Sequence, residues 1–527
     1  MVKTFRKAWI WLALIGFVLS IFSCKQEMKR NENISVEEAV SYYTEKYRPQ
    51  FHFTPEEKWM NDPNGLVYHK GIYHLFYQYY PDSTVWGPMH WGHAVSKDLV
   101  RWKHKPIALF PDENGLIFSG SAVIDKENTA GFGTKEKPAM VAIFTYHDMK
   151  GEQSGKKDFQ TQGIAYSLDD GDSWTKYEGN PVIGNDGIKD FRDPKVFWND
   201  KEQNWTMLLV AGNHLQIWNS LNLKEWKKVS EFGKDKGAHG GVWECPDLFP
   251  LKIEGSDEEK WVLLISINPG APNRGSGTQY FIGDFDGTTF TTDQVESRWI
   301  DLGRDNYAGV TYNDAPSNER IFIGWMSNWD YARDTPTEKW RSAMTVPRKL
   351  TLRRIGDEVS LFNFPVANFD RHVALAYPES ELNIQENRKR VIPLKYSNQS
   401  QLKFTLNDPN VHMYFSNDSG DSLSIQIDGD KKMVNFDRRK SGKIDFSEDF
   451  APSVQQMKIP NLPDEPVEIL ILLDHSSIEM FMNGGQYVIT NQLFPTDFYT
   501  AMTIINTSDE NLKIDDLTEH KIERIWD

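Results

Sequence analysis

Asn61-Asp62-Pro63-Asn64-Gly65-Leu66-Val67-Tyr68, followed by the apolar run Tyr73-His74-Leu75-Phe76-Tyr77, is the stretch that decides the fold. A polar residue beside a Pro or Gly leads into a short apolar strand, and a turn leads into a second one. Four later stretches repeat this order, beginning at Phe118, Arg192, Glu244 and Tyr307. A repeat built from several antiparallel strands predicts β-propeller blades, so residues 46–355 are expected to form five blades.

The alternative is a generic β-sandwich whose hairpins resemble one another by chance. The Pro or Gly near the start of every first strand argues against it. From about residue 370 the pattern changes to short strands such as Ser422-Leu423-Ser424-Ile425-Gln426-Ile427, separated by Asp, Asn and Gly turns. This alternation predicts a two-sheet sandwich over 370–527. The predicted fold is therefore all-β, a five-bladed β-propeller followed by a C-terminal β-sandwich.

The beginning of the chain has the pattern of an export signal. Lys3, Arg6 and Lys7 precede the apolar run 8–22, which is too short to span a membrane comfortably. The run ends Ile21-Phe22-Ser23-Cys24, which resembles a bacterial lipoprotein processing site. We therefore expect a signal peptide over 1–24, lipid modification of Cys24, a polar tether over 25–45, and an exported, membrane-anchored protein at the cell surface or in the periplasm. An ordinary cleaved signal with an incidental cysteine is the alternative.

Composition excludes several classes of function. The net charge of −16 argues against nucleic acid as a partner, because phosphate binding needs clustered Lys and Arg. A neutral sugar meets no such objection, and the 18 Trp residues could supply both a strand-rich core and ring faces for sugars. Apart from Cys24 the only cysteine is Cys245, so no disulfide framework is available.

Three of the repeated units carry a carboxylate near the start of the first strand: Asp62, Asp193 and Glu244. Because first strands line the channel of a propeller, we expect these acids to meet at one mouth of it. Grouped carboxylates raise the pKa of at least one member, and glycoside hydrolysis needs a protonated acid beside a carboxylate. A single Asp-Pro is usually a turn. Asn407-Asp408-Pro409-Asn410 repeats the first motif outside the propeller and is expected to be such a turn.

Other chemistries fit less well. Carboxylates with nearby histidines could hold a cation, but His90 and His93 fall on opposite faces of a strand. Cys245 should point away from Glu244 and serve in packing. No phosphate-binding loop or serine nucleophile elbow stands out. We expect no metal and no cofactor.

Four motifs together resemble glycoside hydrolase family 32, which contains invertases, inulinases, levanases and related fructosyltransferases. They are Trp59-Met60-Asn61-Asp62-Pro63-Asn64-Gly65, Phe118-Ser119-Gly120-Ser121, Arg192-Asp193-Pro194 and Glu244-Cys245-Pro246. The resemblance continues into 437–442 and 474–479. It implies a five-bladed propeller with a sandwich, and retaining catalysis without a cofactor.

By the same resemblance Asp62 is the nucleophile, Glu244 the acid/base, and Asp193 the residue that holds fructose hydroxyls and steadies the transition state. The residues that match the sugar pocket are Trp59, Met60, Asn61, Gln78, Trp86, Phe118, Ser119, Arg192 and Trp325.

The choice of substrate rests on finer similarity. The segments 244–249, 324–329 and 340–345 look like those of microbial exo-inulinases and levanases. We expect removal of terminal fructose from levan, inulin and sucrose, with the membrane reached only through the lipid anchor. The alternatives are an endo-levanase, a fructosyltransferase and a sugar-binding propeller without catalysis. Oligomeric state stays open.

Overall fold

The computed structural model describes residues 43–378, 381–396, 398–463 and 466–526, and the strands below lie in the compact unit Lys46–Asp527. Cys24, the rest of the predicted signal and nearly all of the predicted tether lie outside these described residues. Helical structure in the described part is limited to α2 (Met149–Gln153) and the 3-10 turns η1 (Pro316–Asn318) and η2 (Ala367–His372). No helix among the described residues is long and apolar enough to cross a membrane.

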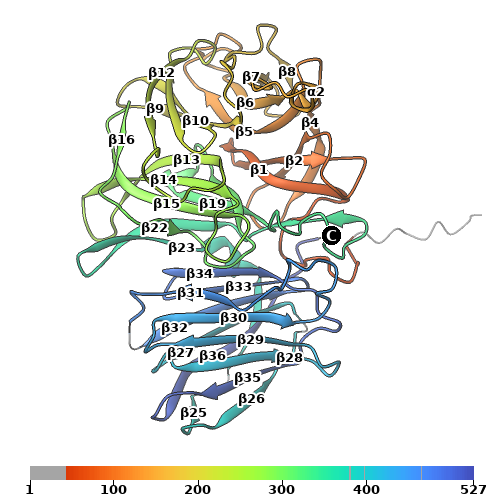
Figure 1. Ribbon diagram of the computed structural model, residues 1–527, viewed down its shortest axis with the longest axis vertical. Helices are drawn as coiled ribbons and strands as arrows, with labels where there is room; N and C mark the ends of the chain where they lie inside the picture. The colour runs from red at the N-terminus through yellow and green to blue at the C-terminus, as the bar shows by residue number, and fades with distance from the viewer. Residues whose placement is uncertain (1–42, 379–380, 397, 464–465, 527) are drawn as a thin grey trace, which may run out of the picture. The chain divides into compact units, whose positions relative to one another are not determined.

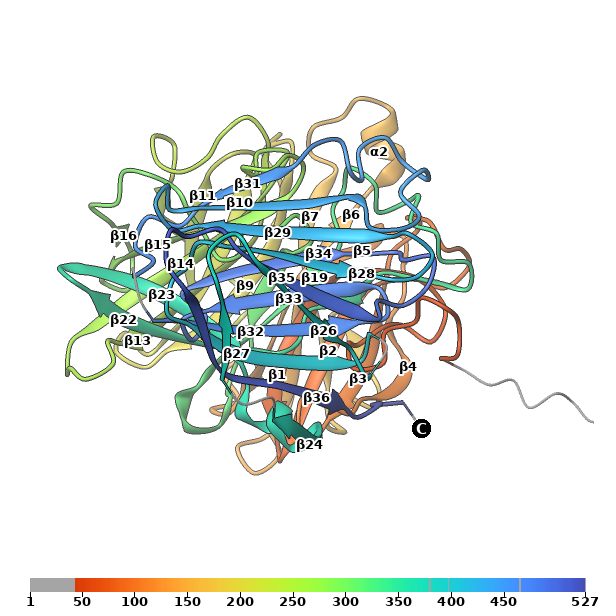
Figure 2. The same ribbon diagram turned by 90° about the horizontal axis from the view of Figure 1, so that it is seen from below.

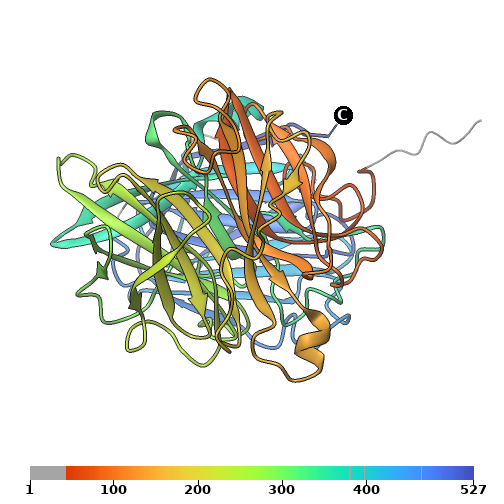
Figure 3. The same cartoon turned by 90° about the horizontal axis from the view of Figure 1, so that it is seen from above.

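Five antiparallel sheets follow one another along the first part of the unit (Figures 1 and 3). The first holds β1 (Lys58–His69), β2 (Ile72–Tyr80), β3 (His90–Ser96) and β4 (Lys103–Leu109), and the second β5 (Leu116–Asp125), β6 (Ala139–His147), β7 (Gln160–Ser167) and β8 (Thr175–Lys176). The third holds β9 (Phe191–Asn199), β10 (Asn204–Ala211), β11 (Leu215–Ser220) and β12 (Lys227–Phe232). The fourth holds β13 (Val242–Lys252), β14 (Glu259–Asn268), β15 (Gly277–Phe285), β16 (Phe290–Thr291) and β17 (Arg298–Trp299), and the fifth β18 (Tyr307–Thr311), β19 (Arg320–Met326), β21 (Ala343–Met344), β22 (Arg348–Ile355) and β23 (Glu358–Pro365).

The first strands of the five sheets form a closed ring. β1 contacts β5, β5 contacts β9, β9 contacts β13, β13 contacts β18, and β18 returns to β1. A short strand from the fifth sheet's region, β20 (Trp340–Arg341), pairs in parallel with the start of β1, where Lys58 lies opposite Trp340. The chain is thus a five-bladed propeller whose ring is closed by pairing between its last and first blades. The predicted fold class is confirmed.

Apolar contact between neighbouring sheets holds the blades together. Every residue of β6 is buried, because both faces of this second strand are covered by adjacent blades. Val141 and Ile143 of β6 pack in one cluster with Met207 and Leu209 of β10. This is why the second strands appear in the sequence as unbroken apolar runs rather than as alternating patterns.

The propeller extends beyond the predicted boundary at residue 355. β22 and β23 form a hairpin in which Ile355 lies opposite Glu358, and Gly356 has a positive φ of 59° in the turn. Gly and Asp are common both in hairpin turns and at the ends of domains. Here the Gly356-Asp357 turn joins the last two strands of the fifth blade. The strand after it completes that sheet.

The second part is a sandwich of two antiparallel sheets (Figures 1 and 2). One sheet holds β24 (Val373–Pro378), β25 (Leu382–Ile384), β27 (Ser400–Leu406), β32 (Val467–Asp474), β33 (Ser477–Met482), β34 (Tyr487–Gln492) and β36 (Leu512–Ile522). The other holds β26 (Lys389–Pro393), β28 (Val411–Ser416), β29 (Ser422–Asp428), β30 (Met433–Lys440), β31 (Gln455–Lys458) and β35 (Ala501–Asn506).

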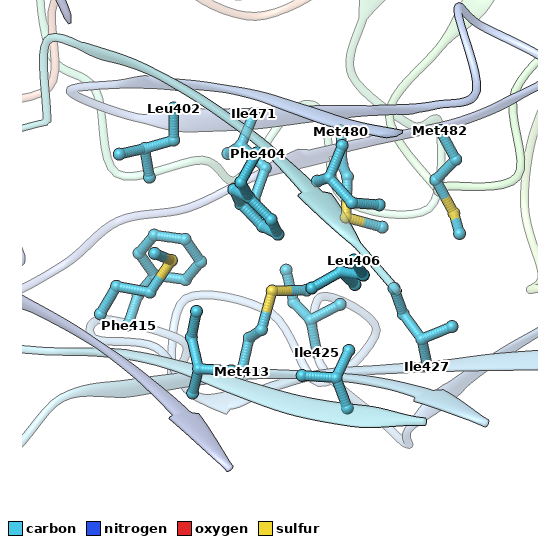
Figure 4. Close-up of a cluster of buried hydrophobic side chains, with 14 of the residues drawn as sticks. Leu402, Phe404, Leu406, Met413, Phe415, Ile425, Ile427, Ile471, Met480 and Met482 are labelled. Carbon is cyan, nitrogen blue, oxygen red and sulfur yellow. The ribbon is translucent and has the colours of Figure 1, made fainter. Parts of the chain in front are cut away.

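The sandwich core comes from alternate residues of the two sheets. Buried and half-buried residues alternate strictly along β28 and β29, as a strand with one covered face requires. Figure 4 shows Phe404 and Met480 of one sheet facing Met413 and Ile425 of the other. The segment 407–410 connects β27 to β28, and the N–H of Asn410 donates to Asp408 Oδ1 (2.7 Å). It is the turn that the sequence predicted.

Buried ion pairs join the propeller to the sandwich. Arg348 of β22 is fully buried and donates to Asp301 (2.9 Å) and to Glu479 of β33 (2.7 Å). Arg438 of β30 donates to Asp305 (2.8 Å), which precedes the fifth blade. The sandwich motifs at 437–442 and 474–479 therefore contain residues that contact the propeller.

Removing Arg348 should uncouple the two domains. An Arg348→Met substitution leaves Asp301 and Glu479 buried without their cation, which should cost about 3–5 kcal/mol. We expect calorimetry to show a lower unfolding temperature and the separation of one transition into two.

The matched control is Arg353→Met, because Arg353 pairs with Glu254 (2.7 Å) but its side chain is 41% exposed. Such a surface pair is worth at most about 1 kcal/mol. Equal unfolding temperatures for the two variants would contradict the coupling role of Arg348.

Candidate active site

Three carboxylates from three blades meet at one mouth of the propeller ring. Asp62 lies on β1, Asp193 on β9 and Glu244 on β13. The Sγ atom of Cys245 lies 3.6 Å from Asp62 Oδ2 and 3.7 Å from Asp193 Oδ2, and Glu244 is the residue before Cys245. Acids that are far apart in the sequence therefore form one cluster.

A β-bulge near the start of every inner strand positions these residues. In each case two residues of the first strand are unpaired opposite one residue of the second strand. The unpaired residues are 61–62, 118–119, 193–194, 245–246 and 308–309. Bulges bend the strand and change the direction of its side chains.

The three acids lie near the start of three first strands, but each has a different position relative to its bulge. Asp62 is the second unpaired residue of its bulge, and Asp193 is the first unpaired residue of its own. Glu244 is the paired residue just before a bulge. The cluster is assembled from three adjacent positions, because the bulges redirect side chains that plain strand alternation would separate.

Short hydrogen bonds fix the carboxylate of Asp62. Oδ1 accepts from Asn61 Nδ2 (2.9 Å), and Oδ2 accepts from the Ser119 hydroxyl (2.6 Å). Asn61 is itself held by Trp59, whose Nε1 donates to Asn61 Oδ1 (2.8 Å). A chain of three residues thus determines where Asp62 points.

Glu244 is held by a guanidinium and a phenol. Arg192 donates to Oε1 through Nη2 (2.8 Å) and Nε (3.2 Å), and its Nη1 donates to Asp190 (2.7 Å). The Tyr307 hydroxyl donates to Oε2. The Glu244 side chain keeps 18% of its surface exposed, so it is open to the funnel as well as tightly positioned.

Strand alternation predicted that Cys245 points away from Glu244 and serves in packing, but its thiol also contacts the carboxylates of Asp62 and Asp193. Its φ is 44°, so the backbone is left-handed at this residue and alternation breaks down. Its N–H donates to Asp193 Oδ2 (3.1 Å). Burial and the nearby carboxylates raise the pKa of Cys245 well above its usual value, so the thiol stays protonated and is no nucleophile.

The cluster raises the pKa of two of its acids. Burial raises the pKa of Asp62 and Glu244 raises it further, while hydrogen bonds from Ser119 and Asn61 act in the opposite direction. Burial also raises the pKa of Asp193, where the Arg192 guanidinium opposes the shift and Glu244 and Asp62 add to it. The site therefore favours sharing of protons over full ionisation.

Tryptophans form one wall beside the acids. The rings of Trp59 and Trp325 lie 6.2 Å apart, and Trp329 lies 5.9 Å from Trp59 and 4.9 Å from Trp325. Trp325 Nε1 is buried and has no hydrogen-bond partner among the described residues. The same is true of Gln78 Nε2, and Gln78 lies opposite the 61–62 bulge.

A second group of aromatic side chains comes from the second blade and the loop after β2. The half-buried Trp86 meets Phe118 edge-on with their ring centroids 6.0 Å apart, and Phe118 stacks on His147 at 4.2 Å. Met60 is fully buried and pairs with Tyr79. Its role in the predicted pocket therefore stays a prediction.

Several residues of the site were missing from the sequence-based set. Tyr307 occupies in the fifth blade the same pre-bulge position as Glu244 in the fourth. That shared position was the available signal. Trp329 and Arg333 had none, because they lie in an irregular loop; the Arg333 guanidinium is 5.6 Å from the Trp329 ring and 6.0 Å from Trp86.

The alternative of a metal site can be examined directly. Within 43–378, 381–396, 398–463 and 466–526, no group of three or more His, Cys, Asp or Glu residues could hold a metal ion. His93 is buried and stacks on Phe76 at 4.2 Å, whereas the half-buried His90 ring contacts Phe110. The two histidines lie apart, as strand alternation predicted.

Both domains of the chain match models of one protein family. The model of the glycosyl hydrolases family 32 N-terminal domain matches residues 52–365, and that of the family's C-terminal domain matches 379–521. A levanase of Bacillus subtilis is 45% identical over 92% of this chain and 72% of that protein. An extracellular exo-inulinase of Aspergillus niger is 38% identical over 92% of this chain and 96% of that protein.

Solved structures of enzymes from the same group are also similar to this chain. The exo-inulinase of Aspergillus awamori has a TM-score of 0.82 and 37% identity, and covers 92% of this chain and 100% of that one. A Schwanniomyces occidentalis fructofuranosidase in complex with fructose has a TM-score of 0.82 and 33% identity, covering 92% of this chain and 100% of that one. The chain is a glycoside hydrolase and belongs to glycosyl hydrolases family 32.

Proposed function

We propose that the protein removes terminal β-linked fructose from levan, inulin and sucrose with retention of configuration. Its relatives include a levanase, exo-inulinases and an invertase. The observation that carries the proposal is a cluster of three acids beside two buried donors that lack partners, Gln78 Nε2 and Trp325 Nε1. Sugar hydroxyls would satisfy such donors, whose burial without a partner is costly.

Asp62 is the proposed nucleophile. Ser119 and Asn61 stabilise its carboxylate form and hold it in one orientation. Attack on the anomeric carbon of fructose forms an ester bond to Asp62 while the bond to the leaving oxygen breaks. Glu244 donates its proton to that oxygen, so the departing sugar leaves as a neutral alcohol.

The second step reverses the role of Glu244. Its carboxylate takes a proton from water, the water oxygen bonds to the anomeric carbon, and the ester to Asp62 breaks. Arg192 and Tyr307 keep the Glu244 carboxyl in place for both transfers. We assign Asp193 to the fructose hydroxyls, because its Oδ2 faces the same space as Asp62 Oδ2 across the Cys245 thiol.

The other residues of the predicted sugar pocket either position the acids or contact the sugar. Trp59 and Asn61 position the nucleophile, and Arg192 positions the acid/base. Trp86 and Phe118 offer an aromatic surface for the apolar face of a sugar, in addition to the group that contains Trp325. Met60 is buried and supports strand β1 by packing. No cofactor takes part in this proposed mechanism.

Export with a lipid anchor is a separate proposal. The curated relatives include extracellular exo-inulinases, and the segment ending at Cys24 resembles a lipoprotein signal. We expect the full-length protein to enter the detergent phase of a Triton X-114 partition when expressed in a bacterium. Cys24→Ser should move it to the aqueous phase, and equal partition of both forms would exclude the anchor.

The proposed activity predicts a defined set of products. Incubation with levan or inulin should release fructose alone, and incubation with sucrose in aqueous methanol should yield methyl β-fructofuranoside, because retention preserves configuration. Chromatography and NMR check both. A ladder of oligomers would point to endo action, growing oligosaccharides from sucrose to a transferase, and no product to a binding module.

Variants in the same assay test the roles of the acids. Glu244→Gln and Asp62→Asn should each lower kcat on sucrose by about 10²-fold or more. The first variant can neither donate nor accept the proton, and the second lacks the nucleophilic carboxylate. The control is Glu127→Gln, since Glu127 is 61% exposed and pairs with Lys135. A Glu244→Gln enzyme as active as the control would remove the acid/base assignment.

The acid cluster should lower the stability of the fold at neutral pH. A carboxyl whose pKa is raised on folding contributes stability at low pH, and this is lost as pH rises through the raised pKa. Asp193→Asn should therefore be inactive but more stable near pH 7 by about 1–3 kcal/mol, since one pKa unit corresponds to about 1.4 kcal/mol. Urea unfolding at several pH values measures this difference, which should shrink toward about pH 4. A variant less stable at every pH would contradict it.

A further inference from the structure

An exposed phenylalanine lies at the same end of the first blade's strands as the acids. Phe110 follows β4, and 53% of its surface is exposed, although the preceding Leu109 is buried. The position follows from the strand pairing: Gln78 lies opposite the 61–62 bulge, Trp91 opposite Gln78, and Leu109 opposite Trp91.

This row of paired residues gives a distance from the nucleophile. Phe110 lies three strands outward from Asp62, and neighbouring strands are about 4.8 Å apart, so the separation is roughly 14 Å. Sucrose has one ring on the leaving-group side of its scissile bond and is too short to reach Phe110 from the acids. A fructan chain is long enough.

The surroundings of Phe110 contact one side of its ring and hold its backbone. The His90 ring meets it edge-on with ring centroids 5.5 Å apart, and His90 Nδ1 bonds to the Pro88 carbonyl (2.9 Å). Lys176 of the second blade donates to the Phe110 carbonyl (2.5 Å) and to Asp112 (2.5 Å). An apolar ring held in water by fixed neighbours loses little conformational freedom when a ligand covers it.

We propose that Phe110 and His90 form a remote platform that binds a fructan chain well beyond the sugar that leaves. This rests on the proposed function and adds a second point of attachment for polymeric substrates. In this proposal the apolar C–H face of a fructose unit stacks on Phe110, and the neighbouring Lys176 ammonium and His90 imidazole are the groups that would hydrogen-bond its hydroxyls. The platform distinguishes polymers from sucrose at the same catalytic centre.

The test compares Phe110→Ala with Leu221→Ala. Leu221 is 75% exposed and follows β11, whose end Ser220 pairs with Trp205 at the opposite end of its blade from Asp193. We expect Phe110→Ala to raise KM for levan or inulin about 5-fold while kcat/KM on sucrose stays within about 2-fold. Leu221→Ala should change neither, and Phe110→Trp should retain polymer kinetics.

Affinity electrophoresis gives a readout that needs no catalysis. In an Asp62→Asn background, native gels containing levan or inulin should retard the parent protein, and Phe110→Ala should reduce the retardation. Unchanged retardation, or equal loss of activity on sucrose and polymer, would overturn the platform. If retardation depends on Phe110 but the enzyme with Asp62 intact hydrolyses neither sucrose nor polymer, the proposed function is rejected and the platform is kept. If the enzyme with Asp62 intact hydrolyses both and neither retardation nor polymer kinetics depends on Phe110, the platform is rejected and the function is kept.

Discussion

One extra residue in each inner strand is the constraint on which the site depends. A regular strand would send neighbouring side chains to opposite faces, and the acids at positions 62, 193 and 244 would not meet. The bulges break this alternation in all five blades near the start of the first strand. The bulges therefore allow five similar strands to place different side chains at one end of the ring.

The sandwich supports this arrangement from outside the ring. Its motif residues Arg438 and Glu479 reach propeller residues through buried ion pairs. His52, just before the first blade, lies 2.7 Å from Asp474 of the sandwich. Burial lowers the pKa of His52, but the hydrogen bonds to Asp474 and Glu479 outweigh it and raise the pKa to about 9. The interface between the propeller and the sandwich thus contains buried charged pairs, which favour one relative placement of the paired side chains.

Sequence reasoning succeeded where a pattern repeated and failed where the backbone was irregular. The five hairpins and the alternation in the sandwich predicted the architecture, because burial imposes a period on each strand. The acids were found because each lies one or two residues before a proline at the start of a unit. The contact of Cys245 with Asp62 and Asp193 was missed because a left-handed φ has no sequence signature in a non-glycine residue. The boundary predicted at 355 falls just before Gly356 in a hairpin turn, because composition alone does not separate a hairpin turn from a domain end.

The pairing of β20 with β1 carries a consequence for how the protein is made. Trp340 and Arg341 are synthesised long after Lys58 and Trp59, with which they pair. Trp59 orients Asn61, and Asn61 orients Asp62. A nascent or truncated chain that ends before this late strand lacks one edge of its first blade. The edge of the first blade that carries Trp59 is therefore complete only after residue 341 has been made, late in the synthesis of the ring.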